Sequence, residues 1–147
     1  MCLRQYAAFD GEGARLAGGR WNRRGFPIVY TSATLSLAAL EYFVHLDIGD
    51  APDDLVAVAA DIPTQVPRSH VTISDLPANW RTYPAPEALA DLGTTWARAR
   101  QTAVLVVPSV VIPHERNYLL NPAHPAFNAI RVGAPETFAF DARMWKG

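Results

Sequence analysis

The chain has 147 residues, of which 50% are hydrophobic and 18% are charged, and its formal net charge is −1. This length predicts a single domain over residues 1–147, and the composition is that of a globular protein, which excludes a disordered chain. The balanced charge gives no support for a nucleic-acid-binding protein, so we expect no direct nucleic-acid partner.

The cysteine content and the hydropathy of the sequence further restrict the class of protein and its compartment. Cys2 is the single cysteine, which excludes an intrachain disulfide and fits a reducing compartment. The first residues contain no long apolar stretch, so we expect no signal peptide. No run of about 18 apolar residues predicts a membrane span. The sequence therefore favours a cytoplasmic protein with no membrane contact.

The first half of the chain alternates short apolar runs with glycine- and arginine-rich sequence. Residues 3–7 predict an opening strand, and residues 10–24 predict an extended loop. Residues 27–32 combine β-branched and aromatic side chains, which predicts a second strand. From Thr34 to about His45 the apolar spacing becomes helical, and Thr34 is a suitable N-cap.

The second half continues the mixture of strands and helices. Residues 54–63 predict a strand that a proline ends, and residues 85–100 predict a helix. Residues 102–109 form the clearest strand pattern of the chain. Residues 127–132 and 136–141 predict two closing strands. This order does not repeat as a βαβ array, so it predicts an α+β domain with a compact mixed β-sheet core and a few helices.

Glu41 interrupts an apolar helix face. It is the only formally charged residue between Leu35 and Leu46, and Leu37, Leu40 and Val44 share its face at helical spacing. Burying a bare carboxylate is costly, so two interpretations stay open. Glu41 either reaches solvent or a structural ion pair, or it faces a cleft and is kept ionised by a cation or polar ligand groups.

Residues 18–22 read Gly-Gly-Arg-Trp-Asn. Two glycines allow close backbone approach or positive φ before Arg20, and guanidinium groups bind phosphate in bidentate geometry. Further arginines surround this region, namely Arg4, Arg15, Arg23 and Arg24. The alternative is an ordinary loop arginine paired with an acid. Neither a P-loop nor a dinucleotide-binding fingerprint is present.

Tyr30 and a late polar segment supply further candidates. Tyr30 is either a half-buried aromatic with a wet hydroxyl or a surface on which a planar ring stacks. Ser109 directly follows a predicted strand, and Asn117, Asn121 and His124 fall in a predicted proline-bounded loop, which suits either function or ordinary turns. The histidine spacing and single cysteine predict no metal site, and no GxSxG elbow supports a serine hydrolase.

Together these motifs resemble the RES domain family. The resemblance covers nearly the whole chain and rests on GGRWN, the strand ending in Tyr30, the Leu-Glu of the following helix, the late NPAHP block and the terminal FAFDARM. It implies a reduced ADP-ribosyltransferase-like fold and a bacterial toxin that destroys NAD by hydrolysis or phosphorolysis of the nicotinamide–ribose bond. NAD is then the substrate, and no cofactor is expected.

The resemblance also assigns residues and partners. It places catalysis on Arg20, Tyr30 and Glu41, and substrate binding on Arg4, Ser109 and Asn117. Ser109 would hydrogen-bond the substrate or position the incoming nucleophile. The expected partners are an Xre-type antitoxin and, as a further implication, a second copy in a homodimer. Two alternatives stay open: an ADP-ribosyltransferase that modifies a macromolecule, and a catalytically silent NAD- or antitoxin-binding module.

Overall fold

The computed structural model describes residues 1–47 and 49–145. Within these residues the α-helices are α1 (Glu12–Ala17), α2 (Leu35–Phe43) and α3 (Glu87–Ala99). The short 3-10 helices are η1 (Arg4–Tyr6), η2 (Ile73–Asp75), η3 (Pro125–Ala129) and η4 (Ala142–Trp145). The strands are β1 (Cys2–Leu3), β2 (Val29–Ser32), β3 (Leu55–Ala57), β4 (Ala60–Asp61), β5 (Arg68–His70), β6 (Val104–Pro108), β7 (Arg116–Leu120), β8 (Arg131–Val132) and β9 (Glu136–Thr137). None of the described helices is long and apolar enough to cross a membrane.

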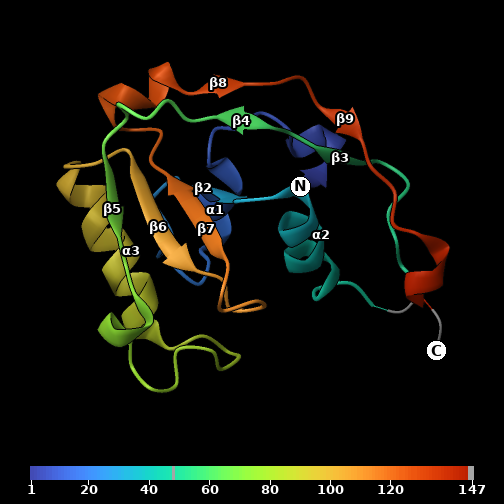
Figure 1. The fold of residues 1–147 in the computed structure, drawn as a ribbon, viewed down its shortest axis with the longest axis horizontal. Coiled ribbons are helices and arrows are strands. Elements are labelled where there is room, and N and C mark those ends of the chain that lie inside the picture. The colour runs from blue at the N-terminus through green and yellow to red at the C-terminus, as the bar shows by residue number, and fades with distance from the viewer. Residues whose placement is uncertain (48, 146–147) are drawn as a thin grey trace.

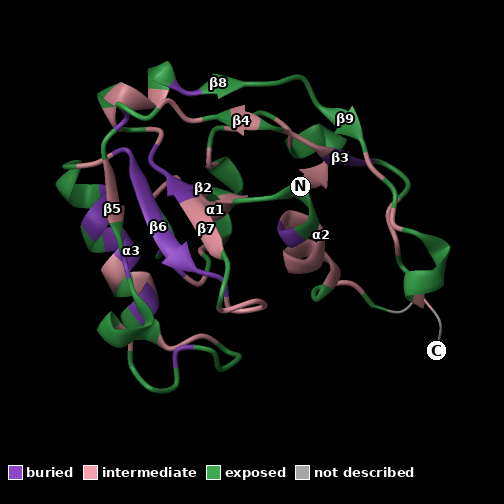
Figure 2. Ribbon diagram, in the orientation of Figure 1, coloured by how far each residue is buried: buried purple, intermediate pink, exposed green. Residues whose placement is uncertain are grey.

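A four-stranded sheet with the order β2-β7-β6-β5 forms the centre of the fold. β7 is antiparallel to both of its neighbours, whereas β5 and β6 are parallel. All residues of β6 are buried, as Figure 2 shows. Its Val-Leu-Val-Val run has the continuous apolar, β-branched character of a strand that is covered on both faces.

Successive side chains of this sheet point to opposite faces, and each face has its own core. One face presents Leu105, Val107 and Leu119, which pack with buried residues of α3 and of the segment before β2. The opposite face presents Val104 and Val106, which pack with residues between β7 and β8. β6 is therefore covered on both faces, whereas β2, β5 and the first residues of β7 are less buried.

The remaining strands form a three-stranded sheet, β1-β3-β9, and a β4-β8 pair. Figure 1 shows β3, β4, β8 and β9 running across the top of the molecule, with α3 on the left beside β5 and β6. α2 lies on the right of the same view, beyond β7. β2 is the edge strand of the central sheet and leads directly into α2, so it connects the central sheet with that helix.

The predicted α+β class is confirmed, and four predicted elements are present. The strands expected at 27–32 and 102–109 contain β2 and β6, and the helix expected at 85–100 contains α3. The helix after Thr34 is α2, and the Thr34 hydroxyl accepts the Leu37 N–H at 3.1 Å as its N-cap.

The N-terminal predictions are wrong in two places. Residues 3–7 do not continue as a strand, because the Ala7 N–H donates back to the Arg4 carbonyl (3.2 Å) and closes η1. The expected loop at 10–24 contains α1. The Asp10 carboxylate accepts the Glu12 N–H (3.0 Å) at the start of that helix and stabilises it despite its glycines.

Predictions for the later strands also differ from the structure. Residues 54–63 split into β3 and β4, which pair with different partners. Residues 127–132 begin inside η3, because His124 Nδ1 accepts the Ala126 N–H (3.0 Å) and a proline opens the turn. The strand expected at 136–141 is limited to β9. Asn117 lies on β7 and not in the predicted loop.

Candidate active site

Residues 19–22 form a tight turn that sends Arg20 and Trp21 in different directions. Two backbone hydrogen bonds between the end residues close this turn. The Trp21 ring is 3% exposed and belongs to the core beside α3. The Arg20 guanidinium instead donates to the carbonyls of Trp80 (2.9 Å) and Thr82 (3.2 Å). The packed tryptophan and the two carbonyls thus fix the direction of the Arg20 side chain.

The charge of Arg20 is partly shielded from solvent. Burial lowers the pKa of Arg20, while the nearby Glu41 carboxylate, Tyr30 and Tyr83 oppose that shift. An arginine stays cationic under these conditions. Among the described residues Arg20 and Glu41 form no direct ion pair, so their charges attract across a short gap.

The Tyr30 hydroxyl is enclosed by the same turn. It donates to Asn22 Oδ1 (2.6 Å) and accepts the Trp21 N–H (3.1 Å). Burial is the main reason that the pKa of Tyr30 lies well above its usual range. A Cβ atom on Gly19 would lie 2.8 Å from this hydroxyl, so only glycine allows the approach. The Tyr30 residue as a whole is 39% exposed, which leaves part of its ring surface open.

Glu41 lies on α2 with its side chain half-buried. One carboxylate oxygen, Oε1, accepts hydrogen bonds from Ser109 Oγ (2.6 Å) and Asn117 Nδ2 (2.7 Å). The partners of Glu41 in the described residues are thus neutral polar groups, whereas the first sequence interpretation expected solvent or an ion pair.

The central sheet brings Ser109 and Asn117 to Glu41. Asn117 on β7 pairs with Val107 of β6 on one side and with Ser32 of β2 on the other. Ser109 follows β6 directly, and its backbone N–H donates to the Glu115 carbonyl (3.0 Å) within the same β6–β7 hairpin. The hairpin therefore delivers both donors to the side of the sheet where α2 begins.

Arg4, the remaining predicted site residue, bonds a different part of the fold. It is exposed on η1, and its Nη2 donates to Thr137 Oγ1 (3.0 Å) on β9. No hydrogen bond or ion pair within residues 1–47 and 49–145 joins Arg4 to Glu41 or Arg20. The structure thus bonds Glu41 to Ser109 and Asn117 and places its charge near Arg20, which in turn lies near Tyr30. Arg4 instead bonds Thr137.

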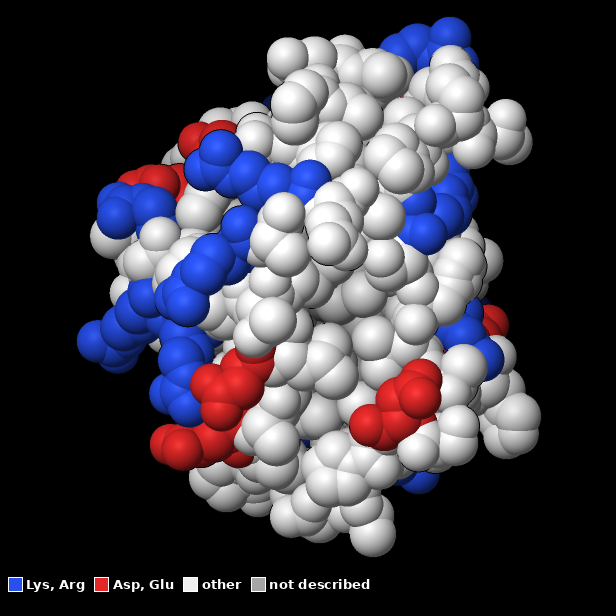
Figure 3. Space-filling view, turned by 90° about the vertical axis from the view of Figure 1, so that its left-hand side faces the viewer, with Lys and Arg blue, Asp and Glu red and all other residues white. Residues whose placement is uncertain are grey.

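Other arginines near the turn are occupied at the surface. Arg15 pairs with Glu12, and Arg23 pairs with Asp91 on α3, both at 2.5 Å. Figure 3 shows one face of the molecule, with basic side chains gathered toward the left of the view and acidic side chains beside them. Arg15 and Arg23 thus form ordinary surface ion pairs.

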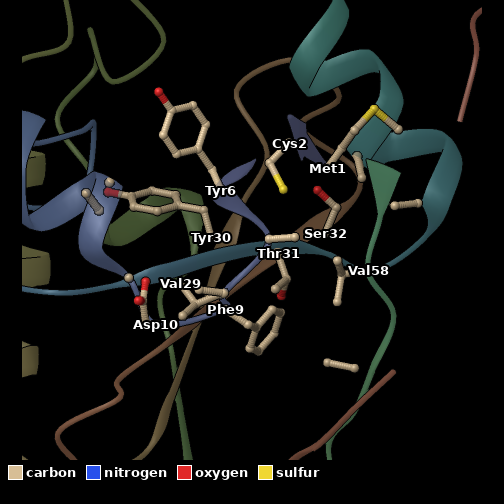
Figure 4. Close-up of a pocket in the computed structure, with 18 of the residues that line it drawn as sticks. Met1, Cys2, Tyr6, Phe9, Asp10, Val29, Tyr30, Thr31, Ser32 and Val58 are labelled. Carbon is tan, nitrogen blue, oxygen red and sulfur yellow. The ribbon is translucent and has the colours of Figure 1, made fainter. Parts of the chain in front are cut away.

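A cavity of about 710 Å³ opens along the outer edge of β2. Its wall includes Tyr6, Phe9, Tyr30 and Ser32, together with residues of the β3–β4 segment. Figure 4 shows the rings of Tyr6 and Tyr30 on one side of this space, with Phe9 below and Cys2 above Ser32. Tyr30 lines the cavity, whereas Arg20, Glu41, Ser109 and Asn117 are not among its lining residues. Tyr30 therefore connects the cavity with the Arg20–Glu41 cluster.

Comparison with known proteins identifies the family. The model of the RES domain matches residues 3–141. The chain belongs to the RES domain family. The "Prs ADP-ribosylating toxin" of Sphingobium sp. (strain YBL2) is 40% identical over 145 residues, which is 96% of this chain and 90% of that protein. "Toxin Res" of Yersinia enterocolitica is 36% identical over 150 residues, covering 98% of this chain and 96% of its own length.

A solved structure supports the same fold for this RES domain. A chain in the crystal structure of the M. tuberculosis MbcT–MbcA toxin–antitoxin complex aligns with a TM-score of 0.65. The alignment covers 92% of this chain and 79% of that one at 16% sequence identity. At this identity the likeness concerns the fold alone.

The sequence analysis did not predict three residues that hydrogen-bond to the site of this RES domain, namely Trp80, Thr82 and Asn22. The carbonyls of Trp80 and Thr82 hold Arg20 from a segment 60 or more positions away along the chain, and no local signal announces this. Asn22 was not predicted as a site residue, although its place inside GGRWN could have marked it as a partner for the Tyr30 hydroxyl. Within the described residues no group of three or more His, Cys, Asp or Glu side chains could hold a metal ion.

Proposed function

We propose that this RES domain is a toxin that depletes NAD by cleaving its nicotinamide–ribose bond, with Arg20, Tyr30 and Glu41 as the catalytic residues. The observation that carries the proposal is the half-buried Glu41 carboxylate, which two donors hold on one oxygen beside Arg20 and Tyr30. The toxin names of its relatives, one of them ADP-ribosylating, support the reaction class.

The proposed chemistry follows from the charge that develops during bond cleavage. Nicotinamide leaves as a neutral group with the electron pair of the glycosidic bond, and the ribose acquires oxocarbenium character. An ionised Glu41 next to the ribose stabilises this positive charge and can orient a ribose hydroxyl. Water or phosphate then attacks the anomeric carbon. No strong general acid is needed, because the leaving group is neutral.

Arg20 and Tyr30 would bind the remainder of the dinucleotide. Arg20 supplies a cation for the pyrophosphate or a donor for the ribose. The exposed part of the Tyr30 ring offers a flat surface to a planar base. The adjoining cavity of about 710 Å³ lies within the range of ligand pockets, about 300 to 1,000 Å³. Its size therefore suits a nucleotide-sized substrate.

The place of action and the protein partner belong to the same proposal. A cytoplasmic location would give the toxin its NAD, and a toxin of this kind requires restraint. The solved toxin–antitoxin complex supports an antitoxin partner. We expect an Xre-type antitoxin to block the access of NAD to Arg20 and Glu41. An inactive complex that still binds NAD would contradict this mode of inhibition.

The test is a product assay with purified protein and NAD, with and without phosphate. Wild type should release nicotinamide, with ADP-ribose as the other product in water and a phosphorylated ADP-ribose in phosphate. Glu41→Gln should lose most of this activity, whereas Glu87→Gln, an exposed α3 variant, should retain it. Equal NAD loss in wild type and Glu41→Gln would refute the enzymatic proposal.

A second candidate is transfer of ADP-ribose to a macromolecule, favoured by the name of the Sphingobium relative. Adenine-labelled NAD distinguishes the two in a bacterial lysate. Label that stays on protein or nucleic acid, with little free ADP-ribose, would favour transfer. Tight NAD binding without any product would instead indicate a silent binding module.

A further inference from the structure

The Ser109 hydroxyl is enclosed at the end of the most deeply buried strand. Ser109 is 0% exposed and directly follows β6, all of whose residues are buried. Its backbone N–H is bonded to the Glu115 carbonyl (3.0 Å). A substrate could reach this hydroxyl only by displacing the side chains that cover it.

The hydrogen-bonding capacity of Ser109 is already filled. A serine hydroxyl has one proton to donate and two lone pairs with which to accept. Ser109 Oγ accepts the N–H groups of Val111 (3.1 Å) and Ile112 (3.0 Å) and donates its proton to Glu41 Oε1 (2.6 Å). No lone pair is left for attack on a carbon atom, and no proton is left for a substrate oxygen.

Asn117 differs from Ser109 in both respects. It is half-buried, and only its Nδ2 is engaged, by Glu41 Oε1 (2.7 Å). Its Oδ1 is enclosed but has no hydrogen-bond partner in the described part of the chain. Asn117 thus has an acceptor atom that could still bind a substrate, whereas the Ser109 hydroxyl has neither a free donor nor a free acceptor.

We propose that Ser109 is a positioning residue that acts through Glu41 and does not contact the substrate. With Asn117 it directs two donors at Oε1, which fixes the rotation of the carboxylate and leaves Oε2 for the ribose. The proposal rests on the proposed NAD cleavage. It replaces the direct substrate contact that the family resemblance implies for this serine.

The test compares Ser109→Ala with Ser69→Ala in both wild-type and Glu41→Gln backgrounds. Ser69 is a matched control, because its hydroxyl lies on the same sheet and bonds Thr102 Oγ1 (3.0 Å) away from the cluster. NAD turnover gives kcat and KM, and calorimetry gives the Kd for NAD. Loss of one hydrogen bond to a charged group predicts a fall in kcat of about 10- to 100-fold for Ser109→Ala. The Kd for NAD should stay within about threefold of wild type, and Ser69→Ala should change neither quantity.

The double variant separates positioning from substrate contact. If Ser109 acts through the Glu41 charge, Ser109→Ala should lower the residual kcat of Glu41→Gln by less than about threefold. Multiplicative losses in kcat, or a Kd raised about tenfold or more, would overturn the proposal. Circular dichroism shows whether Ser109→Ala folds. If it does not, the near-isosteric Ser109→Cys carries the same expectations for kcat and Kd. Ser109→Thr keeps the hydroxyl and should retain kcat.

A spectroscopic measurement keeps the proposal testable if the chain does not consume NAD. In that case the proposed function fails, but the contact between Ser109 and Glu41 still predicts a signal. The ¹³Cδ resonance of Glu41 should move in Ser109→Cys and stay in place in Ser69→Ala. An unchanged resonance in both variants would refute the positioning role independently of activity.

Discussion

Gly93 on α3 provides a sharp test of how the Arg20 turn is held. A Cβ atom at this position would lie 1.8 Å from the Trp21 carbonyl oxygen and 2.8 Å from the Trp21 carbonyl carbon. Both are backbone atoms, so no side-chain rotation relieves the overlap. On the next residue, Thr94 Oγ1 accepts the Arg23 N–H at 2.9 Å. The turn and α3 are thus in direct backbone contact, and Gly93→Ala must push them apart.

The expected change in the free energy of unfolding combines two costs and one gain. Overpacking a well-packed contact costs about 1 to 3 kcal/mol, and an overlap this severe belongs at the upper end. Separation of the turn also loses the Thr94 hydrogen bond, which is worth about 1 kcal/mol. The higher helix propensity of alanine returns about 1 kcal/mol. We therefore expect the free energy of unfolding to fall by about 3 kcal/mol, or the Tm to fall by roughly 6–12 °C.

Urea unfolding followed by circular dichroism measures this change. The matched control is Gly13→Ala, because Gly13 is also helical and a Cβ there meets nothing within 4 Å. It should leave stability unchanged or raise it by up to about 1 kcal/mol. Gly93→Ala should also lower NAD turnover in its folded fraction, since Arg20 adjoins the displaced Trp21. Equal stability of the Gly93 and Gly13 variants would refute the close contact between the turn and α3.

Four further outcomes are expected. Ultraviolet titration of the five tyrosines should show one phenol, Tyr30, that ionises well above the others, because burial raises its pKa. The unfolded chain releases that proton at about pH 10, so the free energy of unfolding should fall as the pH rises above that value. Tyr30→Phe should remove most of this slope, and the remainder belongs to Tyr42, whose pKa burial also raises. Arg20→Lys should lower kcat/KM for NAD about 100-fold with little loss of stability, since an ammonium cannot bond two carbonyls and a phosphate as the guanidinium fork does. Asn22→Ala should lower the free energy of unfolding by about 2 to 3 kcal/mol in urea titrations. It removes the amide oxygen that accepts the proton of the enclosed Tyr30 hydroxyl and the amide nitrogen that donates to three carbonyls. Arg4→Ala should keep NAD turnover within about threefold if Arg4 only binds Thr137, and a larger loss would restore it to the substrate site.

Elements with local signals were predictable from the sequence. Thr34 announces α2 because its cap depends only on residues that follow within one turn. The unbroken apolar run of β6 predicts a strand with both faces covered. β7 has no such signal, since Arg116 and Asn117 lead its sequence and only the pairing with β2 and β6 makes it a strand. The placement of Asn117 therefore depended on tertiary structure.

The candidate site shows the same division between local and distant information. Glu41 was conspicuous because a carboxylate interrupts an apolar helix face, and that argument is local. Its two hydrogen-bond donors come from positions 68 and 76 residues further along the chain. Nothing in the sequence spacing could have chosen them over an arginine. The alternatives for Glu41 could be stated in advance but not decided.

Small and large residues stand together in the GGRWN segment because each has a different structural role. Gly19 makes room for the Tyr30 hydroxyl, and Asn22 receives its proton. Trp21 is buried against α3, and this burial is worth about 2 to 3 kcal/mol for a large apolar side chain. Arg20 is the one member of the turn that the core does not use. Packing of its neighbours thus aims Arg20 at fixed carbonyls before any ligand arrives.

The contacts of Glu41 also determine which substitution tests it fairly. α2 is anchored by its cap, by Leu37 and by the hydrogen bonds that Glu41 Oε1 accepts. Glu41→Ala would leave the buried Ser109 hydroxyl without an acceptor at a cost of about 1 to 3 kcal/mol, so lost activity could reflect lost structure. Glu41→Gln keeps a carbonyl oxygen for both donors and removes only the charge. If catalysis depends on that charge, Glu41→Gln should lose most of its turnover with its Tm near that of wild type, and a stable, fully active Glu41→Gln would show that the carboxylate serves only to dock the helix.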